Sequence, residues 1–385
     1  MVSGFVSDKN KTKAVQYKLS GHNSSALSSE TVPAGQTECR ENYGQMPHAM
    51  LKNTAQAEKY RAKPLTSQQT QTTMNTEANR KTEWVVGIGE ALWDILPEGR
   101  KIGGAPANFA YHMSQFGLRS CAVSAVSAVG DDEAGRELRN QLREKGVGHM
   151  LETVPFPTGT VEVTLDGAGI PSYEIRQGVA WDNIPFTPQI EELARHTRAA
   201  CFGSLAQRSP VSHRTIGRFL ETMPDGEGQY KVFDINLRQH FYTQQVVEES
   251  LRKCNILKIN DEELAVVGSM FGLEGMQPGE QCRTLLDRYG LRIVILTCGA
   301  AGSSVFAPDT RSYIPTPRVE VADTVGAGDS FTASFLAALL SGLGIGEAHR
   351  LAVDVAAHVC SQHGAMPRLP ERFTARLRND GPAIR

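Results

Sequence analysis

From Trp84 onward the chain alternates short apolar segments with longer segments of helical spacing, and this alternation constrains the fold more than any other feature. Segments typical of strands occur at 84–88, 121–129, 199–202, 230–235, 256–259, 293–297 and 303–306. Apolar residues recur at helical spacing in 105–116, 131–145, 189–197, 211–222, 261–267, 280–289, 329–340 and 345–362. Strands joined through helices form mostly parallel sheets, because the crossovers place helices on both faces. We therefore predict an α/β fold with a mostly parallel central sheet covered on both faces.

One segment departs from this alternation. Residues 160–165 and 172–176 alternate apolar and polar side chains, as half-exposed strands do, and the turn Asp166-Gly167-Ala168-Gly169 separates them. We predict a β-hairpin that projects from the main body, a small β lid inserted around 158–180.

The first 81 residues differ in composition from the rest. They are rich in Ser, Thr, Gln, Asn, Lys and Glu, with almost no apolar periodicity. Such a segment buries too little apolar surface to offset the entropy lost on ordering. We predict a disordered extension over 1–81 and a globular domain over 82–385, and a functional start at Met74 is left open.

Charge and cysteine usage exclude several classes of protein. The formal net charge of −2 provides no field that would attract nucleic acid or an anionic membrane. The seven cysteines are widely spaced, with no Cys-x-x-Cys pair, which argues against a disulfide framework or a zinc site. No apolar run is long enough to span a bilayer, and a secretory signal is not apparent. We expect a cytoplasmic protein.

A glycine-rich turn precedes the helical segment at 329–340. It reads Asp-Thr-Val-Gly-Ala-Gly-Asp-Ser-Phe over residues 323–331. Small residues before a helix let main-chain N–H groups approach an anion, and the helix N-terminus adds partial positive charge. Gly326, Ala327 and Gly328 can therefore hold a phosphoryl group, and Asp329 can accept a proton from an attacking hydroxyl. The residues alone explain Asp329 equally well as an acid that favours the first turn of a helix.

Two well-known nucleotide motifs are missing. The phosphate-binding pattern G-x-x-x-x-G-K-[ST] does not occur, and Gly87-Ile88-Gly89 lacks the third glycine of a dinucleotide fingerprint. A nicotinamide-dependent α/β enzyme is therefore disfavoured.

Polar residues that suit a polyol lie near the start of the globular domain. Asp94 ends an apolar, strand-like run, where a carboxylate can accept two neighbouring hydroxyls, although a loop-capping acid is the commoner explanation. Gly103 and Gly104 permit close approach of the backbone, and the amide of Asn108 offers both a donor and an acceptor. A tight turn that starts a helix explains the same three residues.

Together these motifs resemble the ribokinase-like (PfkB) carbohydrate kinases. The segment 323–331 resembles the family's C-terminal signature, and Gly-Gly-Ala-Pro-Ala-Asn at 103–108 resembles its N-terminal signature. The resemblance covers about residues 84–370, with the signatures in the family's order. Gly-Glu-Ala-Leu-Trp-Asp at 89–94 and Gly-Ser-Leu-Ala at 203–206 are most like the bacterial fructokinase branch.

The resemblance implies a role for each candidate residue. Asp329 would be the base, and Gly326, Ala327 and Gly328 would form the anion hole. The sugar would contact Asp94, Gly103, Gly104 and Asn108, with Arg176 and Arg238 as further sugar or phosphate contacts. A solvated arginine at a strand end explains Arg176 equally well.

The resemblance also implies which residues contact the nucleotide. ATP would lie against Lys258, Asn260, Thr297, Gly299, Gly302, Gly328 and Ala357, and Glu263 would contact Mg²⁺ through water. Asn260 and Glu263 also have the spacing of a helix capping box, which the residues alone favour. Ala300-Ala301 lies where many relatives have a charged or polar residue, so the detail of the nucleotide contact departs from the family.

The implied activity is ATP-dependent phosphorylation of a sugar. The leading hypothesis is that D-fructose is converted to fructose 6-phosphate. Ribose, a keto-deoxy sugar acid, or a non-catalytic sugar or nucleotide sensor are the alternatives. The expected partners are the sugar, ATP and Mg²⁺, with a homodimer through the lid and a monovalent cation left open.

Overall fold

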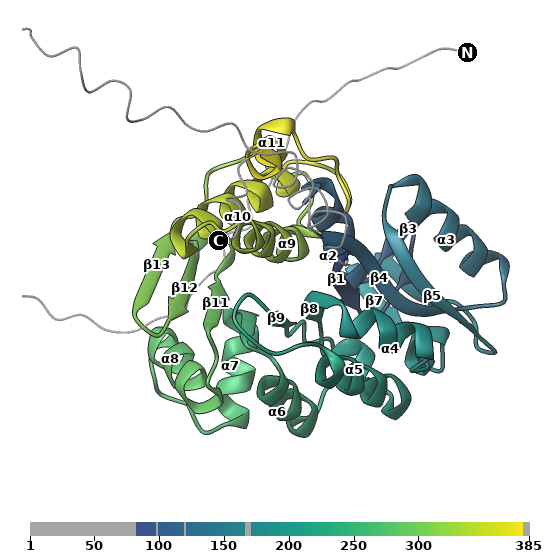
Figure 1. The fold of residues 1–385 in the computed structure, drawn as a ribbon, viewed down its shortest axis with the longest axis horizontal. Coiled ribbons are helices and arrows are strands. Elements are labelled where there is room, and N and C mark those ends of the chain that lie inside the picture. The colour runs from purple at the N-terminus through teal and green to yellow at the C-terminus, as the bar shows by residue number, and fades with distance from the viewer. Residues whose placement is uncertain (1–81, 98, 119–120, 166–170, 380–385) are drawn as a thin grey trace, which may run out of the picture. The chain divides into compact units, whose positions relative to one another are not determined.

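The computed structural model describes residues 82–97, 99–118, 121–165 and 171–379 (Figure 1). The extension predicted over residues 1–81 lies outside the described residues. Within the described part, the strands form a nine-stranded and a four-stranded sheet. The predicted α/β fold with a mostly parallel central sheet and a small second sheet is therefore confirmed.

The nine-stranded sheet runs in the order β13-β12-β11-β10-β9-β8-β1-β4-β5. Its strands are β1 (Glu83–Ile88), β4 (Cys121–Gly130), β5 (Gly148–Val154), β8 (Thr197–Phe202), β9 (Tyr230–Asp234), β10 (Ile256–Asn260), β11 (Ile293–Thr297), β12 (Ser303–Ala307) and β13 (Thr310–Ile314). The strands from β5 to β11 pair in parallel. β12 and β13 are antiparallel to their neighbours, because only short turns connect them.

Helices cover both faces of this sheet (Figure 1). One face packs against α2 (Ala105–Gln115), α9 (Ala327–Leu340), α10 (Ile345–Cys360) and α11 (Glu371–Asn379). The other face packs against α4 (Pro188–Arg195), α5 (Pro210–Thr222), α6 (Gln244–Lys253), α7 (Asp261–Met270) and α8 (Pro278–Tyr289). α3 (Glu133–Glu144) packs beside β5 and β2.

Both faces are apolar because successive residues of a strand point to opposite sides. In β11, Ile295 is buried in the core on the α9 face and Leu296 in the core on the α8 face. Strands covered on both sides are therefore continuous apolar runs, which is the pattern that the sequence shows.

The four-stranded sheet runs in the order β3-β2-β6-β7. Its strands are β2 (Leu92–Leu96), β3 (Gly99–Gly103), β6 (Gly159–Leu165) and β7 (Pro171–Ile175). β6 and β7 form the predicted antiparallel pair, whereas the turn predicted over 166–169 lies outside the described residues. β2 and β3 widen this sheet beyond the segment around 158–180, because β2 pairs in parallel with β6.

Several elements were not predicted from the sequence, namely β3, β5, β13, α6 and α11, and β2 was expected only as a strand-like run that ends at Asp94. β5 and β13 are sheet edges in which few side chains are fully buried, so they lack the apolar runs of the central strands. In α6 and α11 charged residues obscure the apolar spacing.

Candidate active site

Polar residues and one glycine from several strands gather at the carboxyl edge of the central sheet. Glu90 follows β1, Gly203 follows β8, and Asp234, Asn260 and Thr297 end β9, β10 and β11. Parallel strands bring their carboxyl ends to one edge, where α/β proteins bind ligands. This edge is the candidate site.

The glycine-rich turn takes the geometry that the sequence predicts. Gly326 is the N-cap of α9 with φ of +79°, and a Cβ there would lie 2.4 Å from the carbonyl oxygen of Ala365. A side chain is excluded by both the backbone conformation and the contact. The helix begins at Ala327, two residues before its predicted start, so Asp329 is the third residue of its first turn.

Asp329 contacts a residue that lies 221 positions earlier in the chain. Asn108 Nδ2 donates a hydrogen bond to Asp329 Oδ2 at 2.8 Å. Asn108 is 4% exposed and lies on α2, directly after the Gly103-Gly104 turn. The two signature segments therefore meet at one carboxylate.

The environment of Asp329 favours its protonated form. Burial is the largest cause, the carboxylate of Asp234 adds to it, and together they raise the pKa of Asp329 to about 6. The ammonium of Lys258, the hydrogen bond from Asn108 and the charge of Arg238 act in the opposite direction. Asp329 is thus ionised at pH 7 and above, and it is a better proton acceptor than an ordinary aspartate.

A buried network of hydrogen bonds lies against the glycine-rich turn. Lys258 Nζ donates to Asp234 Oδ1 at 2.9 Å, and Thr332 of α9 donates to Asp234 Oδ2 at 2.8 Å. Burial would lower the pKa of Lys258, but the carboxylates of Asp234 and Glu263 outweigh it and raise the pKa. A Cβ on Gly328 would lie 2.7 Å from Lys258 Nζ, so this cation lies against the turn. Sequence analysis assigned no role to Asp234, although it lies near the end of the strand predicted over 230–235.

Asp94 is placed differently from the prediction. It lies in the middle of β2, in the small sheet, and does not end a strand of the central sheet. Its side chain lies over Gly103, where a Cβ would be 2.3 Å from Asp94 Oδ2. Burial raises the pKa of Asp94 to about 6, against the opposing charge of Lys101. Gly104 O accepts the N–H of Asn108 at 2.9 Å, so the turn connects Asp94 to the Asn108–Asp329 pair.

The loop after β9 carries Asn236 and Arg238. Asn236 has a φ of +50°, which is uncommon for a residue other than glycine. Arg238 is exposed, and its charge acts on both Asp329 and Glu90. Glu263 holds this loop, because its Oε1 accepts the N–H of Leu237 at 3.0 Å.

The capping box at α7 is confirmed. Asn260 Oδ1 accepts the N–H of Glu263 at 2.8 Å, and Glu263 Oε2 accepts the N–H of Asn260 at 3.0 Å. Both residues therefore have a structural role, whatever else they bind.

The turn between β11 and β12 lies beside the end of β10, since Thr297 pairs with Asn260. Gly299 and Gly302 have φ of +51° and +122°, and Thr316 Oγ1 donates to Gly299 O at 2.6 Å. Ala357 is buried on α10.

Arg176 follows β7 and its side chain is exposed. Its carbonyl oxygen accepts a hydrogen bond from Arg208 Nη2 at 2.5 Å. The position at the base of the β6–β7 pair agrees with a solvated arginine at a strand end.

Two findings limit what else the described residues can do. They hold no cluster of three or more His, Cys, Asp or Glu side chains that could ligate a metal by themselves. Over the same residues, no helix combines the length and apolar character needed to cross a bilayer.

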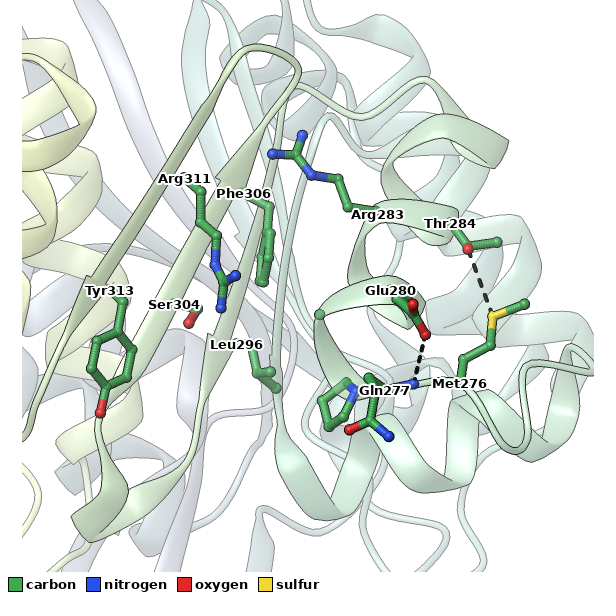
Figure 2. Close-up of a pocket in the computed structure, with 12 residues that line it drawn as sticks. Met276, Gln277, Glu280, Arg283, Thr284, Leu296, Ser304, Phe306, Arg311 and Tyr313 are labelled. Carbon is green, nitrogen blue, oxygen red and sulfur yellow. Dashed lines mark hydrogen bonds between the residues drawn. The ribbon is translucent and has the colours of Figure 1, made fainter. Parts of the chain in front are cut away.

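A separate hollow lies between α8 and the edge strands β12 and β13 (Figure 2). Figure 2 shows Arg311 and Tyr313 on the strand side and Met276, Gln277 and Glu280 on the helix side. It opens on the α8 face, whereas Asp329 lies at the N-terminus of α9 on the other face. This hollow is distinct from the candidate site.

Comparisons with known proteins agree with this geometry. A fructokinase of Salmonella typhimurium is 29% identical over 269 residues, which cover 66% of this chain and 83% of that protein. A nucleoside kinase of Methanothermobacter thermautotrophicus is 29% identical over 293 residues, which cover 73% of this chain and 87% of that protein. The crystal structure of an uncharacterized sugar kinase from Pyrococcus horikoshii in complex with ATP superposes with a TM-score of 0.61 at 25% identity, covering 73% of this chain and 94% of that one.

The family model "pfkB family carbohydrate kinase" matches residues 98–372. This range contains the Gly103-Gly104 turn, the Asn108–Asp329 pair and the whole of α9. The chain belongs to the pfkB family of carbohydrate kinases.

Proposed function

We propose that this protein transfers the γ-phosphoryl group of ATP to a hydroxyl of a sugar, and that the sugar is D-fructose, which gives fructose 6-phosphate and ADP. The observation that carries the proposal is the hydrogen bond from Asn108 to Asp329, which joins a polyol-binding turn to a carboxylate at a helix N-terminus. The similarity of this chain to the fructokinase of Salmonella typhimurium supports the choice of fructose.

Asp329 is the base in this proposal. Its carboxylate takes the proton of the attacking sugar hydroxyl, and the pKa of about 6 leaves it ionised at neutral pH. Gly326, Ala327 and Gly328 present main-chain N–H groups at the start of α9, where the helix dipole favours the developing negative charge. Lys258, against Gly328, adds a fixed positive charge.

The sugar lies between the two sheets in this proposal. Asp94 accepts hydroxyl hydrogens from the side of the small sheet, and Asn108 lies on the side of the central sheet. Gly103 lets the Asp94 carboxylate lie against the turn, and Arg238 contributes a cation at the rim. The β6–β7 pair acts as part of a lid that excludes water, which otherwise competes with the sugar for the phosphoryl group. Arg176, at the end of this pair, is the remaining proposed contact.

ATP lies along the ends of β10 and β11 in this proposal. Asn260, Thr297, Gly299 and Gly302 form one wall, and Ala357 of α10 forms the other. Mg²⁺, when bound with ATP, would neutralise part of the phosphate charge. Since the described residues hold no ligand cluster of their own, phosphate and water would supply most ligands. Both Glu263 oxygens already accept main-chain N–H groups, which fits contact through water.

An assay of ADP release over a panel of acceptors tests the proposal. Purified protein with ATP and Mg²⁺ is offered fructose, ribose, a keto-deoxy sugar acid and a nucleoside. Fructose should have the highest kcat/KM. Activity with ribose and none with fructose contradicts the substrate, and no activity with any acceptor contradicts the kinase.

The proposed function leads to two further predictions. A homodimer through the β6–β7 lid would appear as twice the monomer mass in light scattering. Titration with K⁺ against Na⁺ in the same assay would detect dependence on a monovalent cation.

A further inference from the structure

Glu90 is a buried carboxyl beside the base that the proposed mechanism does not use. It follows β1 by two residues and is 2% exposed. Glu90 Oε1 accepts the N–H of Ala105 at 3.3 Å. Among the described residues, Glu90 Oε2 finds no hydrogen-bond partner. A buried carboxyl oxygen without a hydrogen-bond partner destabilises the fold, so Glu90 needs an explanation.

Glu90 replaces a missing helix cap. Ala105 is the first residue of α2, and the N-cap residue Gly104 has no side chain to accept a first-turn N–H group. Glu90 supplies the acceptor from 15 positions earlier in the chain. Its main chain is also in contact, because a Cβ on Gly104 would lie 2.3 Å from Glu90 O. Glu90 therefore holds the first turn of α2 through its side chain, and its backbone lies close to Gly104.

This first turn carries the residue that binds the base. Asn108 N donates to Gly104 O at 2.9 Å, and Asn108 Nδ2 donates to Asp329 Oδ2 at 2.8 Å. We propose that Glu90 is a positioning residue of the kinase, which holds Asn108 against Asp329 by capping α2. The proposal rests on the proposed function for its effect on turnover, but not for its effect on α2.

A direct contact between Glu90 and the sugar is the less favoured role. Both the Glu90 Oε2 atom and the Asn108 Oδ1 atom are covered by protein. Burial raises the pKa of Glu90 to about 7, against the hydrogen bonds that it accepts, and the nearby charge of Asp329 raises it further. Near neutral pH, Oε2 can therefore hold a proton while Oε1 still accepts from Ala105.

Two substitutions separate capping from bulk stability. Glu90→Gln keeps an oxygen that can accept from Ala105, whereas Glu90→Ala removes it. Thr187→Ala is the matched control, because Thr187 Oγ1 caps α4 at the same distance of 3.3 Å, away from the site. The assays are steady-state kinetics, thermal unfolding, and hydrogen exchange of the peptide that covers 104–113.

We expect kcat of Glu90→Ala to fall about 100-fold with little change in the KM for ATP, as misplacement of a reacting group does. Glu90→Gln should keep kcat within about threefold, because the acceptor is retained. Amide protection over 104–113 should fall at least about tenfold in Glu90→Ala only. Thr187→Ala should lower the unfolding temperature without lowering kcat.

Several results overturn the proposal. Normal protection over 104–113 in Glu90→Ala does so, and so does a Glu90→Gln variant as defective as Glu90→Ala. An equal loss of kcat in Thr187→Ala would assign the effect to stability alone. The exchange measurement needs no substrate, so it tests Glu90 even if the wild-type protein phosphorylates no acceptor, a result that contradicts only the proposed function.

Discussion

Replacing the proposed base by its neutral isostere should abolish turnover and stabilise the protein. Burial raises the pKa of Asp329 from 3.8 to about 6, so the folded protein binds this proton more tightly than the unfolded chain does. A shift of about 2 pKa units corresponds to about 3 kcal/mol, the cost of keeping the carboxylate ionised in the folded state. Asp329→Asn removes the charge and keeps an oxygen that can accept from Asn108.

The sign of the pH dependence follows from the same values. The folded pKa lies above the unfolded one, so the wild-type protein loses stability as the pH rises from about 4 to about 6, and the full cost remains above that range. Asp329→Asn should therefore raise the free energy of unfolding by about 2–3 kcal/mol at pH 8. At pH 4 the gain should fall to about 0.5 kcal/mol, because the folded carboxyl is then protonated and the unfolded one is only partly ionised.

Urea unfolding of the two proteins at pH 4, 5, 6 and 8 measures this difference, and the ADP-release assay measures turnover. Asp287→Asn is the control, because Asp287 is exposed on α8 and its replacement should change stability by less than about 0.5 kcal/mol. Loss of stability at pH 8, or a gain that does not vary with pH, refutes the reasoning about burial. Near-normal turnover of Asp329→Asn eliminates the base.

Further measurements test the surroundings of the base. The kcat/KM of the wild-type protein should fall about tenfold per pH unit below a pKa of about 6, and a flat profile down to pH 5 would contradict Asp329 as the titrating group. Asn108→Ala should move the acidic fall of this pH profile to higher pH and lower kcat/KM by about 10- to 100-fold, because it removes a hydrogen bond to the charged carboxylate. An unchanged pH profile would show that the bond does not matter. Lys258→Met should cost about 3–5 kcal/mol by leaving Asp234 buried and unpaired, and Lys258→Met with Asp234→Leu should recover part of it in urea unfolding. Deleting residues 1–73 should leave kcat unchanged, and an insoluble product would contradict a dispensable extension.

Much of the site could be located from the sequence, because its residues lie in short segments with strong local constraints. Gly326 is required by a positive φ and by close contact with Ala365, and such a position appears in the sequence as a glycine before a helix. The same turn predicted the start of α9 to within two residues. The capping box of Asn260 and Glu263 was legible from spacing alone.

The residues that sequence reasoning missed depend on contacts between distant segments. Glu90 lies in a segment that was matched to a family motif, yet only its burial and its bond to Ala105 give it a role. Asp234 gains its role from Lys258 and Thr332, which come from two other elements. The placement of Asp94 was wrong because β2 turns away into a second sheet, and an apolar run does not specify its partner strand.

The sequence by itself determined the α/β class, the order of most elements and the family, because hydrophobic periodicity and glycine turns are local properties of the chain. Only the tertiary structure decided which polar groups share a desolvated site. Burial and neighbouring charges raise the pKa of Asp329 and Glu90, and both causes depend on segments brought together by the sheet. The chemistry of the carboxyl groups is therefore a property of the fold, whereas their identity is a property of the sequence.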